Sequence, residues 1–133
     1  FLKSLKFAYQ FTSESANAIA TGNLLRLSEQ NLIDCAPCWG CSGGWPVDAL
    51  NYVKDKQQKQ FMSESDYPFT GFDGTCQLDY SKLVGRITSI QLVNDGDENQ
   101  RKERVATFGV ASVCISAEYL ILMNAQKSIM QLL

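Results

Sequence analysis

The five cysteines are the residues of this chain that could take part in the most kinds of chemistry, and the chain contains no histidine. A cysteine thiolate can act as a nucleophile, bind a metal ion or form a disulfide, and a buried thiol can pack as a small apolar side chain. Histidine is the usual general base near neutral pH and a common metal ligand, so its absence from the 133 residues limits both kinds of chemistry. The five are Cys35, Cys38, Cys41, Cys76 and Cys114.

The cluster Cys35-x-x-Cys38-x-x-Cys41 permits several interpretations. Its spacing resembles the opening of an iron–sulfur motif, but the Cys-Pro that should complete the motif does not follow. Four thiolates, including that of Cys76, could hold zinc, and Cys38 with Cys41 could form a redox pair. No thioredoxin-like βαβ pattern surrounds that pair. We therefore favour disulfides, which are typical of an oxidising compartment, and expect no metal and no cofactor.

Charge and hydropathy exclude two classes of partner. The formal net charge is -2, and Glu103 interrupts the longest basic cluster, Arg101 to Arg104. Without a net positive charge or a basic stripe, we expect no binding to nucleic acid or to anionic membranes. No run of about 18 apolar residues occurs, so we expect no transmembrane span. The first residues lack the apolar region of a signal peptide, which favours a mature or internal piece.

Hydrophobic spacing and capping residues predict four helices and two strands. The first helix should end at Thr21-Gly22, because glycine suits the left-handed position after a helix. The second should begin after Ser28, a good N-cap, and the third near Trp45-Pro46, with proline in its first turn. The other expected elements are strands at 83–93 and 110–115 and a helix at 95–108.

Four short strings of residues stand in a characteristic order. They are Leu27 to Cys35 (LSEQNLIDC), Gly40 to Pro46 (GCSGGWP), Glu64 to Gly71 (ESDYPFTG) and Asp73 to Cys76 (DGTC). In this order and spacing they closely resemble the papain family of cysteine peptidases. Val110 to Ile115 also resembles a strand of that family, so the resemblance extends from about Ser4 to Ala117.

The resemblance implies an α+β fold of the papain type. Residues 1–108 would form the helical left domain with its N-terminal part missing. Residues 109–133 would begin the β-rich right domain and would be truncated or divergent there. Tyr119 to Leu133 indeed departs from the family's usual aromatic-glycine pattern.

The same resemblance implies part of a peptide-binding cleft. Gly43 and Gly44 would bind an extended substrate through main-chain groups, since glycine permits a close approach that a Cβ would block. Trp45 and Pro46 would be walls of the apolar pocket that selects a substrate side chain, and Cys114 would be its side wall. Without the resemblance, the glycines are an ordinary tight turn, Trp45 a core aromatic and Cys114 a small buried apolar residue.

The disulfides follow from the resemblance as well. Cys35 and Cys76 match a disulfide of the family. Cys41 matches another disulfide position whose usual partner is absent from this chain. Cys38, only three residues away, is a plausible substitute, and Cys114 would then stay free.

The position of the family's nucleophilic cysteine holds a residue without a thiol. A register without gaps places Ser4 there, and a register that deletes about one helical turn places Ala8 there; we prefer Ser4. The first cysteine of the chain is Cys35, so neither register supplies a thiol. The resemblance implies that the family's His and Asn lie beyond this chain and its oxyanion-hole Gln before it. A dyad of Ser4 with a neighbouring lysine is not expected, because the lysine pKa is about 10.4.

These observations predict a fragment or inactive homologue of a papain-like endopeptidase that retains part of the peptide-binding cleft. The expected partner is a peptide or protein substrate, together with the missing second half of the peptidase. Two alternatives stay open: an active peptidase whose His and Asn lie outside this chain, and a non-enzymatic peptide-binding module. The cysteines favour a secreted protein or a lysosome- or vacuole-like compartment.

Overall fold

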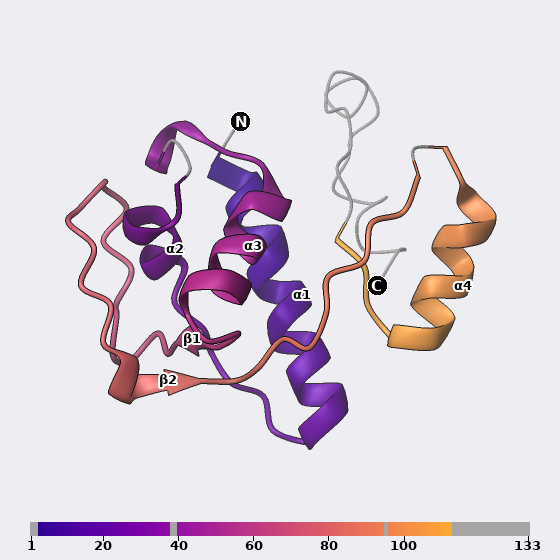
Figure 1. Ribbon diagram of the computed structural model, residues 1–133, viewed down its shortest axis with the longest axis horizontal. Coiled ribbons are helices and arrows are strands. Elements are labelled where there is room, and N and C mark those ends of the chain that lie inside the picture. The colour runs from indigo at the N-terminus through magenta and orange to yellow at the C-terminus, as the bar shows by residue number, and fades with distance from the viewer. Residues whose placement is uncertain (1–2, 38–39, 95, 113–133) are drawn as a thin grey trace, which may run out of the picture.

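Three helices form the main body of the molecule. The computed structural model describes residues 3–37, 40–94 and 96–112. In Figure 1, helix α1 lies beside α2 and α3 and contacts both, and the short 3-10 helix η1 joins α2 to α3. The bounds of these elements are Lys3–Thr21 for α1, Glu29–Cys35 for α2, Gly40–Ser42 for η1 and Pro46–Lys56 for α3.

Local capping residues explain where these helices begin and end. Gly22 follows α1 with a φ of 75°, and its N–H donates to the carbonyl of Ala18 at 2.8 Å. Ser28 caps α2, since its hydroxyl oxygen accepts from the N–H of Asn31 at 2.9 Å. Pro46 occupies the first turn of α3, directly after Trp45. The expected helix end at Thr21-Gly22 and the expected starts of α2 and α3 are confirmed.

The core lies between α2, α3 and the segments that flank them. Each of its members is less than a tenth exposed, and fully burying a side chain of the size of valine or larger stabilises the fold by roughly 1.5–3 kcal/mol. The cluster consists of Leu27, Leu32, Ala36, Ala49, Val53 and Phe61. It holds α2 and α3 together, and the candidate site described below stands on these two helices.

The sheet is a single short antiparallel pair. Strand β1 (Phe61–Met62) pairs with β2 (Leu83–Val84), with Phe61 opposite Val84. The prediction of a strand over 83–93 is wrong beyond Val84. Gly85 has a φ of 58°, which leaves the extended conformation and ends the pairing. The 3-10 helix η2 (Tyr80–Lys82) leads into β2.

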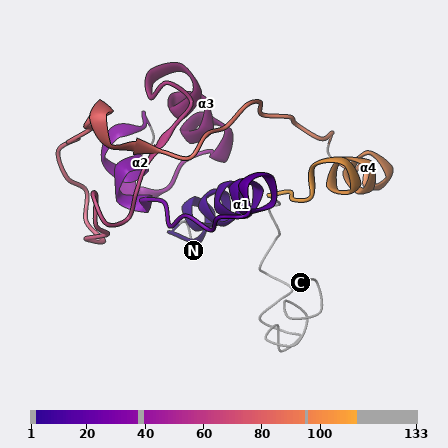
Figure 2. The ribbon, with the colours of Figure 1, turned by 90° about the horizontal axis from the view of Figure 1, so that it is seen from below.

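Helix α4 (Glu98–Phe108) stands apart from the other helices, as Figures 1 and 2 show. The Asp97 carboxylate caps its start, Gly109 ends it with a φ of 86°, and none of its residues is buried. The helix predicted at 95–108 is thereby confirmed from Glu98. A domain boundary at residue 108 stays a prediction. Residues 110–112 form neither helix nor strand, and the rest of the strand expected at 110–115 lies outside the described residues.

Candidate functional site

The first turns of α1 carry both positions proposed for the replaced nucleophile. The helix begins at Lys3, so Ser4 lies in its first turn and Ala8 in its second. The backbone N–H groups at a helix start make that end electropositive, which is where a family nucleophile would be held as a thiolate. Which of the two residues occupies the family position stays a prediction.

Gly43 and Gly44 have backbone conformations that side chains disfavour. Their φ angles are 121° and 144°, and the Gly43 N–H donates to the Gly40 carbonyl at 3.3 Å, which closes the turn of η1. Gly43 is buried and Gly44 is half-buried. Any other residue would be strained at either position, so the two glycines meet a requirement of the backbone.

Trp45 lies on the surface although it is one of the largest apolar residues. Its exposed fraction is 70%, and it directly precedes the half-buried Pro46. The interpretation of Trp45 as a core aromatic is therefore wrong, and its indole is accessible to a ligand.

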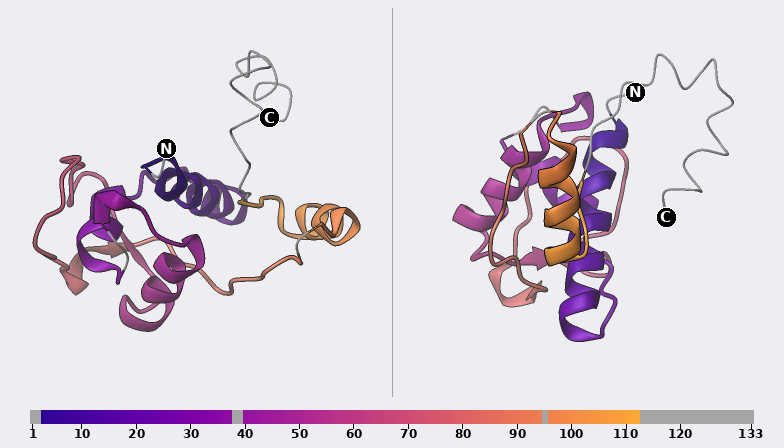
Figure 3. Two further views of the ribbon diagram at one scale, coloured as in Figure 1. Left: turned by 90° about the horizontal axis from the view of Figure 1, so that it is seen from above. Right: turned by 90° about the vertical axis from the view of Figure 1, so that its right-hand side faces the viewer.

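The glycine pair and the start of α1 lie at the same end of the helical body. The segment that runs from η1 into α3 and the first turn of α1 are both at the top of Figure 1, and the right-hand view of Figure 3 agrees. The fold thus brings the Ser4 position and the Gly43–Gly44 edge to one end. Cys114, the expected side wall of the pocket, lies outside the described residues.

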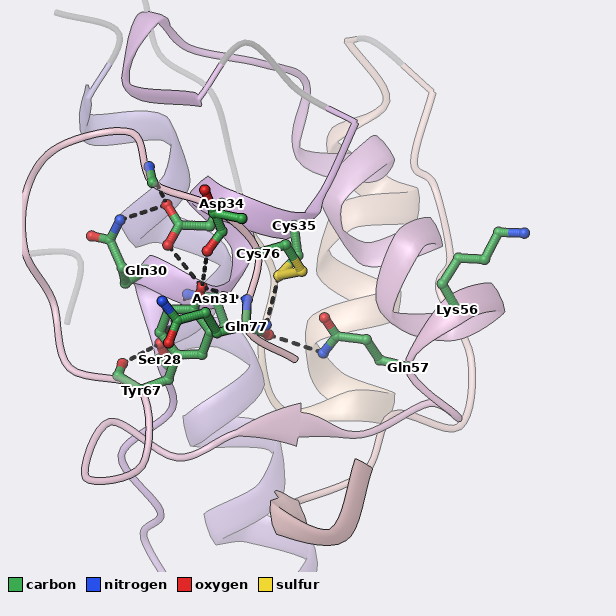
Figure 4. The surroundings of a disulfide bond; sticks show 12 residues. Ser28, Gln30, Asn31, Asp34, Cys35, Lys56, Gln57, Tyr67, Cys76 and Gln77 are labelled. Atoms are coloured by element: carbon green, nitrogen blue, oxygen red, sulfur yellow. Dashed lines mark hydrogen bonds between the residues drawn. A yellow bond between two sulfur atoms is a disulfide. The ribbon is translucent and has the colours of Figure 1, made fainter. Parts of the chain in front are cut away.

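A disulfide joins Cys35 to Cys76, as expected, with a Cα–Cα distance of 4.7 Å (Figure 4). It links the last residue of α2 to an exposed loop across a sequence separation of 41 residues. Asn31, one helical turn before Cys35, approaches the Cys35 sulfur through its side-chain amide at 3.4 Å.

Cys41 is a free thiol. The expected bond between Cys38 and Cys41 is therefore not formed, and Cys38 itself lies outside the described residues. The geometry of η1 directs the Cys41 sulfur toward the carbonyl of Gly71, 3.4 Å away, while the Cys41 N–H donates to the Asp73 carboxylate. That carboxylate also occupies the space in which a side chain at Gly40 would lie, so η1 and the loop that contains Asp73 fit closely.

Gln30, on α2, binds the same loop from the other side. Its amide oxygen accepts from the N–H groups of Thr70 at 3.0 Å and Gly71 at 3.2 Å, and its amide nitrogen donates to the carbonyl of Phe72 at 2.7 Å. Gln30 is only 1% exposed, and its remaining amide hydrogen bond goes to Asp34 at 2.7 Å. The side chain therefore satisfies three backbone groups that no strand or helix would pair.

Asp34 and Tyr67 continue this network, which Figure 4 displays. The Tyr67 hydroxyl donates to Asp34 at 2.8 Å and accepts from the N–H of Gln77 at 3.2 Å, and the Gly74 N–H donates to Asp34 at 2.9 Å. Burial raises the pKa of Tyr67 above its usual 10.0, and the hydrogen bond to Asp34 raises this pKa further. The phenol therefore stays protonated near neutral pH and acts as the donor.

Sequence reasoning assigned Ser28 as a helix cap and Cys35 to a disulfide, but it gave no function to Gln30, Asp34 or Tyr67, which lie in the same strings. Ser28, Gln30, Asp34 and Cys35 all fall in the first string, and all bind the segment from Tyr67 to Cys76. Their common property is structural: they hold one loop on α2. Among the described residues, no group of acidic, cysteine or histidine side chains is placed to hold a metal ion, and no helix could span a membrane.

Helices α1 to α3, the loop that the disulfide closes and the glycine pair before α3 form a helical body of the type found in cysteine peptidases. The family model described as papain family cysteine protease matches residues 5–132, so the chain belongs to the papain family.

Individual relatives agree with this assignment. Pro-cathepsin H of Bos taurus is 36% identical over 113 residues, which cover 81% of this chain and 33% of the relative. Zingipain-1 of Zingiber officinale is 40% identical over 94 residues, covering 70% of this chain and 42% of the relative. The structure of digestive procathepsin L2 proteinase from the larval midgut of Tenebrio molitor superimposes with a TM-score of 0.71 at 37% identity. It aligns with 79% of this chain and 34% of that chain, which confirms the papain-like α+β fold.

The chain thus spans about a third of the length of the cathepsin relatives that it matches.

Proposed function

We propose that these 133 residues are a fragment or inactive homologue of a papain-like endopeptidase, which retains part of the peptide-binding cleft and does not hydrolyse peptides by itself. One observation carries the binding half of this proposal. Gly43 and Gly44 hold backbone conformations with positive φ, immediately before an indole that is 70% exposed. An extended peptide would pair with the main chain of the two glycines and direct one apolar side chain against Trp45 and Pro46.

The lack of hydrolysis follows from the chemistry of proton transfer. The Ser4 hydroxyl would need a base to remove its proton, and the chain contains no histidine. Losing triad members in a serine protease leaves only about 10³–10⁴-fold catalysis over water, and that remainder depends on an intact oxyanion hole and cleft. A peptidase whose catalytic His and Asn lie outside these residues is the second candidate, because the chain spans about a third of its cathepsin relatives.

The disulfide supports the compartment proposed for the protein. Cys35 and Cys76 form a bond that persists in oxidising surroundings and is rare in the reducing cytosol. We therefore place the protein outside the cell or in a lysosome- or vacuole-like compartment. One relative is described as a digestive proteinase of the larval midgut, which is consistent with an extracellular setting.

Turnover of a fluorogenic peptide by the purified chain tests the catalytic half of the proposal. We expect no turnover above buffer, and none after Ser4→Cys, because a restored thiol would still lack an imidazole to protonate the leaving amine. Turnover that a thiol-specific reagent abolishes would show a working cysteine nucleophile. That result would replace the proposal with an active peptidase.

Peptide binding to a Gly44→Val variant tests the binding half. The substitution should abolish the binding of an extended peptide by blocking access to the main chain. Gly22→Val is the matched control, because Gly22 also has a positive φ of 75°, no atom lies near its side-chain position, and it lies at the far end of α1. Equal affinity in the Gly44→Val and Gly22→Val variants would contradict the proposal.

A further inference from the structure

Phe72 is the most exposed large apolar side chain among the described residues, at 78%. It lies in the loop from Phe69 to Asp73, which we call the aromatic loop. The ring of Phe69, itself 45% exposed, reaches to within about 4 Å of the side-chain position of Gly71. Two phenyl groups thus flank one glycine on the surface. The aromatic loop therefore carries two exposed aromatic side chains within four residues.

Hydrogen bonds from the buried Gln30 and the half-buried Cys41 hold the aromatic loop around Phe72. The carbonyl of Phe72 accepts from Gln30, and Gln30 also accepts from the N–H of Gly71. The next residue, Asp73, accepts from the N–H of Cys41. A loop held in this way presents Phe72 without first having to be ordered. A partner that binds the ring therefore loses less conformational entropy than it would with a flexible loop.

The aromatic loop directly adjoins the segment that leads to the glycine edge. Cys41 contacts Asp73 through its N–H and Gly71 through its sulfur at 3.4 Å. Gly43 comes two residues after Cys41, and Trp45 four residues after it. The segment from Cys41 to Trp45 therefore spans at most about 14 Å. An extended peptide of about four residues covers the same distance.

We propose that Phe72 is a specificity-determining residue, which provides a second apolar contact for peptides bound along Gly43 and Gly44. The favoured ligand is an extended peptide with one apolar side chain against Trp45 and a second aromatic or large aliphatic side chain several positions away. This inference rests on the proposed function of the glycine edge and adds a substrate preference to it.

Two kinds of acetylated and amidated peptide test the inference with the 133-residue chain. Both kinds of peptide carry one leucine for the Trp45 contact. The second kind also carries one phenylalanine, and its members differ in the position of this residue, about two to six residues from the leucine. Fluorescence anisotropy of the labelled peptides gives the affinities. Among the peptides that carry both leucine and phenylalanine, the one that binds best should lose affinity by about tenfold in the Phe72→Ser variant, because partial burial of an aromatic ring is lost. The same substitution should leave the affinity for the peptide without phenylalanine unchanged. Phe72→Leu should retain most of the affinity for the peptide with both residues.

Leu24→Ser is the matched control, because Leu24 is 72% exposed and follows the opposite end of α1. It should leave both affinities unchanged. If Phe72→Ser and Leu24→Ser act alike while Gly44→Val abolishes binding, the role of Phe72 is overturned and the peptide-binding edge stands. If neither peptide binds the unsubstituted chain, or if Gly44→Val has no effect, the proposed function fails and the inference about Phe72 fails with it.

Discussion

At the scale of single residues, Gln30 connects the sequence motif to the surface. It is buried on α2, yet its amide group forms hydrogen bonds with three consecutive residues of the aromatic loop, Thr70, Gly71 and Phe72. Each of these bonds satisfies a backbone group that would otherwise depend on water. The single side chain therefore replaces the neighbouring strand that this loop does not have.

Replacing Gln30 by alanine should lower the free energy of unfolding by about 2–3 kcal/mol, because it leaves loop donors and an acceptor without partners. Urea unfolding followed by circular dichroism measures the change. Gln91→Ala is the control, since Gln91 is exposed and such substitutions stay within about 0.5 kcal/mol. Equal midpoints for the two variants would show that water replaces the amide at no cost.

The residues of the site could be predicted unevenly from the sequence. Gly43 and Gly44 were singled out because glycine permits a close approach to the main chain, and their positive φ angles give a second reason for glycine at both positions. The function of Gln30 could not be predicted, because its partners lie about 40 positions away in the chain and nothing local to Gln30 indicates them. The predicted pairing of Cys38 with Cys41 considered sequence distance only, whereas η1 directs the Cys41 sulfur to Gly71.

At the scale of elements, α2 organises the molecule although it has only seven residues. Such a short helix has little stability of its own, because forming its first turn is unfavourable. It is stabilised instead by its cap at Ser28, by the buried side chains of Leu32 and Ile33, and by the disulfide from Cys35. The helix and the loop that it holds should consequently gain and lose their order together.

Reduction of the disulfide between Cys35 and Cys76 should lower the free energy of unfolding by roughly 4 kcal/mol in the chain-entropy model, because the bond closes a loop of about 40 residues. Unfolding by urea with and without a reducing agent measures this loss. Cys41→Ser should change the stability by less than about 1 kcal/mol, because Cys41 is free.

Peptide mapping without reduction provides an independent check of the pairing. A cross-linked peptide that contains Cys35 and Cys76 is expected, together with alkylation of Cys41. Alkylation of both Cys35 and Cys76 in the folded protein would contradict the assignment.

The helices could be predicted better than the strands. Caps and glycine ends are local signals, and Ser28, Pro46 and Gly22 all acted as expected. A strand also needs a neighbouring strand to pair with. The alternating apolar residues in 83–93 do not indicate whether such a neighbour exists. Within the part of the chain that the structure describes, β2 pairs with β1 alone, and β1 has two residues, so the pairing ends at Val84.

At the scale of the whole molecule, α3 and α4 differ in packing although each has 11 residues. Helix α3 buries Ala49 and Val53 in the core, whereas α4 buries none of its residues and stands apart in Figure 2. Most helical stability in proteins comes from packing of an apolar face. The two helices should therefore differ in how often they open.

Backbone amides of α4 should exchange with deuterium about tenfold faster or more than those of α3, since local opening needs less free energy where little surface is buried. Hydrogen exchange followed by mass spectrometry resolves the two helices. Equal protection would contradict this expectation and would indicate that α4 and α3 open together as one cooperative unit. The equal length of the two helices removes differences that arise from helix length alone.

The close fit between Gly40 and Asp73 has a consequence for how this sequence can change over time. The carboxylate of Asp73 fills the space beside Gly40, and Gly40 itself has a φ of 51°. Aspartate at 73 can be replaced by a smaller residue while glycine remains at 40. A side chain at 40 would force the Asp73 carboxylate to move and to give up its hydrogen bond with the Cys41 N–H, unless position 73 had already become smaller. Asparagine or aspartate would be preferred at 40, because both tolerate a left-handed backbone. The order of the two changes therefore matters: the route that first shrinks residue 73 costs less stability than the route that first changes Gly40.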